Sequence, residues 1–69
     1  MKTYTIYRCG MWFDYEHTLK DAKESVLADV YDREVCGQAP VNYEVFFKGD
    51  EVWRKDARKM APNERRKVC

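Results

Sequence analysis

The chain has 69 residues, of which 45% are hydrophobic, 14% aromatic and 36% charged, and its formal net charge is +1. This length allows a single domain, residues 1–69, whose small core leaves little volume for an enzyme pocket. The aromatic content excludes a disordered chain, and no apolar stretch approaches the length of a membrane span.

The cysteines indicate a reducing compartment. There are three of them, Cys9, Cys36 and Cys69, so one has no possible partner within the chain, and none lies near another. The chain begins without an apolar run typical of a signal peptide, so we expect a cytoplasmic protein with free thiols. A zinc site on Cys9, His17 and Cys36 would lack the closely spaced ligand pair that such sites use, and we expect no metal or other cofactor.

The first half of the chain predicts a strand and a helix. Residues 3–9 are rich in β-branched and aromatic types, which favours a strand. Residues 11–15 form either a second short strand or a loop that carries exposed aromatic side chains. Residues 18–36 predict one long helix, which begins at Thr18 as N-cap and ends at Gly37.

The predicted helix is amphipathic. Its apolar stripe, which we expect to face the core, consists of Leu19, Ala22, Val26 and Val30. Asp21, Asp29 and Asp32 are expected on the opposite, solvent-facing side. Asp29 and Arg33 have the spacing of an ion pair along one helix face.

Residues 41–55 alternate between apolar and polar types, which predicts a β-hairpin. A two-residue turn at Gly49–Asp50 would place Phe46 opposite Trp53 on one face. Two cross-strand charge pairs follow from the same register: Lys48 with Glu51, and Glu44 with Lys55. The aromatic pair would either serve recognition or pack under the C-terminal segment as a second small core.

Residues 56–69 form a basic C-terminal segment, which is either a short helix opened by Pro62 or a loose tail. The order of the elements is strand, helix, strand, strand. We therefore expect an α+β domain of β-α-β-β type, in which one amphipathic helix packs on a three-stranded sheet. The sheet becomes four-stranded if residues 11–15 are a strand.

Charge is distributed unevenly along the chain. Residues 54–69 contain seven basic and two acidic residues, a balance of +5, whereas residues 1–53 contain six basic and ten acidic residues, a balance of −4. The acidic helix face could therefore dock on a basic groove of a partner protein, or residues 54–69 could bind the phosphates of a nucleic acid.

The residue types do not form a catalytic set around His17, the single histidine, and we expect a binding protein that is not an enzyme. The candidate partner-binding residues are acidic on the helix, aromatic on the hairpin and basic near the C-terminus: Asp29, Asp32, Phe46, Trp53, Arg58, Arg65 and Arg66.

The layout resembles that of anti-CRISPR proteins, small inhibitors made by phages and other mobile elements. The resemblance rests on a first strand from Tyr4 to Arg8, a helix around Ala22 to Tyr31, and a closing hairpin of Tyr43 to Phe47 and Val52 to Trp53. It lies in size and architecture and not in a motif, so it identifies no functional residues. It implies an inhibitor that acts in the cytoplasm of a bacterial host on a larger protein or ribonucleoprotein complex. The alternative is a small nucleic-acid-binding module that acts through residues 54–69.

Overall fold

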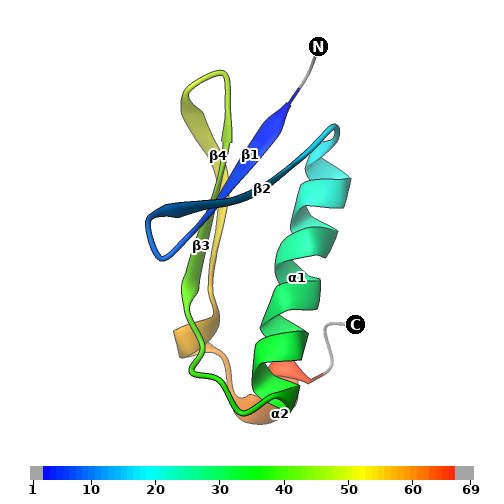
Figure 1. Cartoon of the computed structure of the whole chain (residues 1–69), viewed down its shortest axis with the longest axis vertical. Coiled ribbons are helices and arrows are strands. Elements are labelled where there is room, and N and C mark those ends of the chain that lie inside the picture. Colours follow the sequence, from blue (N-terminus) through cyan, green and yellow to red (C-terminus); the bar gives the residue numbers. More distant parts are fainter. Residues whose placement is uncertain (1–2, 67–69) are drawn as a thin grey trace.

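The computed structural model describes residues 3–66, and these residues form an α+β domain, as predicted (Figure 1). Their elements are β1 (Tyr4–Arg8), β2 (Met11–Glu16), α1 (Leu19–Val35), β3 (Asn42–Phe47), β4 (Asp50–Asp56), the 3-10 turn η1 (Ala57–Lys59) and α2 (Pro62–Arg65). All strand pairs are antiparallel, and the strands lie side by side in the order β2-β1-β3-β4. Residues 11–15 belong to a strand, so the sheet is four-stranded.

Both ends of α1 are formed as the sequence predicts. The Thr18 hydroxyl accepts a hydrogen bond from the Asp21 backbone N–H at 3.0 Å, which satisfies one free donor of the first turn. At the other end Gly37 has a φ of +73°, a left-handed conformation that glycine adopts without strain. The Gln38 N–H then donates to the Arg33 carbonyl at 2.8 Å, which closes the last turn.

The core lies between α1 and one face of the sheet. Its fully buried side chains come from α1, from the two central strands and from η1: Ala22, Val26, Val30, Ile6, Tyr43, Val45 and Ala57. The predicted apolar stripe of α1 is therefore confirmed, with Leu19 partly buried at its edge. Figure 1 shows α1 running alongside the sheet, with α2 packed near its C-terminal end.

The register of the β3–β4 hairpin differs from the prediction. The turn residues are Lys48 and Gly49, with φ values of +53° and +85°, because this type of tight turn needs two left-handed residues and favours glycine second. A bulge follows, so that Phe46 lies opposite Glu51 while Val45 lies opposite Trp53. The expected Phe46–Trp53 pair is wrong, and these two side chains lie on opposite faces of the sheet.

The same shift removes both predicted charge pairs of the hairpin. Glu44 lies opposite Arg54, and neither Lys55 nor Lys48 meets its expected partner. Arg54 instead binds the Glu51 carboxylate, with Nε at 3.0 Å and Nη2 at 2.7 Å from Oε2.

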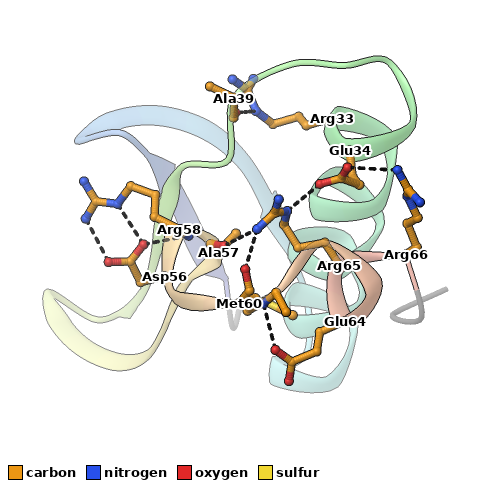
Figure 2. A network of polar contacts seen from close by, with 11 residues as sticks. Arg33, Glu34, Ala39, Asp56, Ala57, Arg58, Met60, Glu64, Arg65 and Arg66 are labelled. Atoms are coloured by element: carbon orange, nitrogen blue, oxygen red, sulfur yellow. Dashed lines mark hydrogen bonds and ion pairs between the residues drawn. The ribbon is translucent and has the colours of Figure 1, made fainter.

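Arg65 of α2 bonds both to α1 and to the backbone of residues 57–60 (Figure 2). Its Nε donates to the Glu34 carboxylate on α1 at 2.6 Å, and its Nη1 donates to the backbone carbonyls of Ala57 and Met60. Both charged side chains are shielded, with exposed fractions of 11% for Arg65 and 14% for Glu34. Of the two alternatives left open for this segment, a short helix or a loose tail, the described residues form the helix α2, and this ion pair connects it to α1.

The shielded pair predicts a large effect of one substitution. Arg65→Ala leaves the Glu34 carboxylate shielded without its main partner, so we expect the free energy of unfolding to fall by about 3 kcal/mol. Urea denaturation followed by circular dichroism measures this loss. Arg66→Ala is the matched control, because Arg66 is 64% exposed and lies 3.5 Å from the same carboxylate, and it should cost less than about 1 kcal/mol. Equal losses for the two variants would contradict the structural role of Arg65.

Candidate functional site: the uncovered face of the sheet

The helix covers one face of the sheet and leaves the other uncovered. Residues that oppose each other in an antiparallel pair project to the same side, so the register assigns each side chain to a face. Ile6 and Val45 point toward α1, and their strand neighbours point away from it. The uncovered face, called the outer face below, consists of Thr5, Tyr7, Trp12, Tyr15, Asn42, Glu44, Phe46, Glu51, Arg54 and Asp56.

Aromatic side chains cross the outer face from the edge strand β2 to the central strand β3. Trp12 is 60% exposed and Tyr15 is 51% exposed, and each lies opposite an outer-face residue of β1. The Tyr7 and Phe46 rings meet edge to face with their centroids 5.4 Å apart. Exposed aromatic side chains gathered on one face are typical of a surface that binds another molecule.

Of this aromatic set, only Phe46 is among the candidate binding residues named from the sequence, and exposed aromatic side chains at residues 11–15 were expected only if that segment was a loop. A bulge in β2 explains the difference, because Phe13 is an extra residue between the Ile6–Asp14 and Tyr7–Trp12 pairs. Phe13 packs on the core against Tyr43, and this places Trp12 on the outer face. Simple alternation along residues 11–16 could not have located the bulge.

The outer face is slightly acidic. It carries three carboxylates and one guanidinium. Arg54 holds Glu51 in a bidentate contact, and Arg58 of η1 holds Asp56. The first of these contacts lowers the pKa of Glu51 and raises the pKa of Arg54. Among residues 3–66 Glu44 has no ion pair within 4.0 Å, but Arg54 lies opposite it and Arg58 lines a small depression beside it.

A hollow of about 470 Å³ lies on this face. Thr5, Tyr7, Glu44 and Phe46 of the two central strands line it, together with Gly10 and Gly49 of the two hairpin turns. A depression of this size is in the range of small-molecule and side-chain binding sites.

Asp29 was expected on the solvent-facing side of α1 together with Asp21 and Asp32, and this expectation is wrong. Both of its carboxylate oxygens accept hydrogen bonds at 3.1 Å from Nη1 of Arg8, at the end of β1. The buried Tyr43 hydroxyl also donates to it. Asp29 therefore joins α1 to the two central strands, while Asp32 is exposed.

The expected Asp29–Arg33 pair is wrong, because the Arg33 guanidinium donates instead to the Ala39 backbone carbonyl at 2.9 Å.

The Trp53 side chain lies on the side of the sheet that faces α1. It packs against the core, and the Lys23 ammonium lies 5.8 Å from the centre of its ring. Of the two predicted aromatic residues, only Phe46 belongs to the outer face.

The three predicted basic residues differ in their contacts, and Figure 2 shows Arg65 between Arg58 on one side and Arg66 on the other. Arg58 contacts the Asp56 carboxylate at 2.8 Å, and this hydrogen bond lowers the pKa of Asp56 to about 2. Arg65 is shielded in its contact with Glu34, whereas Arg66 is largely exposed. Lys67 and the third cysteine, Cys69, lie outside the described residues.

Neither a metal centre nor a membrane helix emerges from the described part of the chain. Residues 3–66 contain no group of three His, Cys, Asp or Glu side chains placed to hold a metal ion. No helix among them is long and apolar enough to cross a membrane. Cys9 and Cys36 are exposed free thiols.

Comparison of the chain with protein-family models, with curated proteins and with solved structures finds no match in any of the three.

The contact between Tyr43 and Asp29 predicts a pH dependence. Burial, and then the hydrogen bond to Asp29, raise the pKa of Tyr43 well above its usual 10.0. At neutral pH Tyr43→Phe should lower the free energy of unfolding by about 1.5 kcal/mol, because Asp29 loses a shielded donor. Above pH 10 the difference between the two proteins should shrink, because Tyr43 then ionises only in the unfolded wild-type chain.

Urea denaturation at several pH values between 7 and 11 tests this expectation. Tyr31→Phe is the control, because the Tyr31 hydroxyl makes no hydrogen bond to any residue between 3 and 66. A difference between wild type and Tyr43→Phe that stays constant up to pH 11 would show that the hydroxyl does not support the fold.

Proposed function

We propose that this chain is a non-enzymatic binding protein that docks its outer face on a larger partner protein and so inhibits or modulates that partner. The single observation that carries the proposal is the aromatic set on the outer face, Tyr7, Trp12, Tyr15 and Phe46, which no element of the described chain covers. Tryptophan and tyrosine are enriched among the residues that contribute most of the binding energy in protein interfaces.

The charges favour a protein partner over a nucleic acid. Nucleic-acid surfaces combine stacking aromatic side chains with lysine and arginine, since phosphate contacts supply much of the affinity. The outer face has the aromatic side chains, but its own balance is −2 and its one guanidinium is held by Glu51. Binding of nucleic acid through residues 54–69 has less support, because Arg58 and Arg65 both have carboxylate partners.

The class of partner follows from the resemblance in size and layout to anti-CRISPR proteins. It implies a larger protein or ribonucleoprotein complex that handles nucleic acid in a bacterial cytoplasm. A domain of this size can block such a complex by occupying one of its surfaces, without any reaction of its own. The phage origin and the inhibitory outcome are parts of the proposal.

Affinity capture from a bacterial lysate tests the proposal. The wild-type protein and Trp12→Ala are used as baits, with and without nuclease treatment. We expect a stoichiometric protein that survives nuclease and binds Trp12→Ala at least about 30-fold more weakly, since an interface tryptophan that acts as a hot spot contributes about 2 kcal/mol or more. Val35→Ala is the matched control, because Val35 is 59% exposed on α1 away from the outer face.

Three results would contradict the proposal. Capture of nucleic acid alone, lost on nuclease treatment, would favour the basic C-terminal segment. Loss of the partner in Asp32→Lys but not in Trp12→Ala would move the surface to the acidic side of α1. A dimer of the chain that Trp12→Ala dissociates, seen by analytical ultracentrifugation, would show that a second copy covers the outer face.

A further inference from the structure

Four side chains of the two central strands line the hollow on the outer face. Thr5 opposes Phe46 and Tyr7 opposes Glu44, so the four side chains form two neighbouring pairs across the central strands β1 and β3. These strands are hydrogen-bonded on both sides, which holds the four side chains on a rigid support. Strand pairing therefore fixes the backbone that carries the hollow.

The lining residues favour a positive charge. The Tyr7 and Phe46 rings are inclined at 78°, so the pair presents both a ring face and a ring edge, and ring faces attract cations. The Glu44 carboxylate adds a formal negative charge, and the Thr5 hydroxyl adds a hydrogen-bond acceptor. None of the residues that line the hollow is basic, so it offers no counter-charge to a phosphate or carboxylate.

The neighbouring basic side chains are engaged elsewhere. The Lys48 ammonium lies over the Phe47 ring, 5.4 Å from its centre, and Phe47 belongs to the helix side of the sheet. Arg54 is held by Glu51 through Nε and Nη2. Arg54 lies opposite Glu44, and Arg58, which also lies beside Glu44, is held by Asp56. None of the three basic residues lines the hollow, which leaves room there for a cation from outside the chain.

We propose that the hollow receives an arginine side chain of the partner protein. A guanidinium is planar, so it can stack on an aromatic ring while its N–H groups donate to a carboxylate. The volume of about 470 Å³ admits such a side chain. This inference rests on the proposed function, since it assigns one anchor residue of the partner to the same outer face.

A small probe tests the chemistry of the hollow without the partner. The full-length ¹⁵N-labelled protein is titrated with N-acetyl-arginine methylamide and followed by amide chemical shifts. We expect saturable shifts at Tyr7, Glu44 and Phe46, with a dissociation constant on the order of 1 mM, an affinity suited to a ligand of this size. N-acetyl-citrulline methylamide, which has nearly the same shape but no charge, should bind at least about tenfold more weakly.

Two variants assign the binding to its residues. Glu44→Gln should lower the affinity for the arginine probe about tenfold, and Phe46→Leu about threefold. These factors match the usual strengths of a charged contact and of an exposed cation–π contact. Glu24→Gln, on the exposed surface of α1, is the matched control and should leave the affinity unchanged. Dispersed amide spectra of each variant establish that it is folded.

The possible outcomes separate this inference from the proposed function. Equal binding of the arginine and citrulline probes, shifts centred outside the hollow, or no effect of Glu44→Gln would overturn the cation site. If Trp12→Ala abolishes partner capture while Glu44→Gln leaves it intact, the proposed function stands and the arginine anchor is refuted. If the probe binds as expected but no protein is captured through Trp12, the cation site stands and the proposed function fails.

Discussion

One helix can cover only one face of a four-stranded sheet, and the organisation of this domain follows from that constraint. The α1 stripe of Ala22, Val26 and Val30 closes the core against the two central strands. The described chain has no second layer for the other face, so the aromatic side chains of β1, β2 and β3 stay accessible there. The outer face is therefore a direct consequence of having one helix on a four-stranded sheet.

The charges serve two separate purposes. Several that attract attention in the sequence hold the fold together, since Asp29 joins α1 to Arg8 and Tyr43, and Arg65 joins α2 to Glu34. On the outer face, by contrast, Glu44 has no ion pair with any described residue and borders a hollow with aromatic walls. The net charge of +1 therefore says little about the outer face, whose own charged residues are mostly acidic.

Local signals predicted the elements well, and tertiary details decided the site. Thr18 and Gly37 bound the helix in both the sequence and the structure, because capping depends on a few neighbouring residues. The hairpin was also predicted, but its turn lies one residue earlier and a bulge follows it, so Phe46 and Trp53 separate to opposite faces. The contacts of Asp29 depend on residues 14 and 21 positions away, which helical periodicity cannot reveal.

The central claim is that the outer face contacts the partner, and site-specific photo-crosslinking tests it most directly. A benzophenone amino acid is introduced in place of Trp12, or of Val35 on α1, and the cells that contain the partner are irradiated. The account predicts a covalent adduct with one protein from position 12 and none from position 35. An adduct from position 35 and none from position 12 would place the binding surface on the helix and contradict the account. The same holds if a third variant, with the benzophenone amino acid at position 32, gives the adduct and position 12 does not.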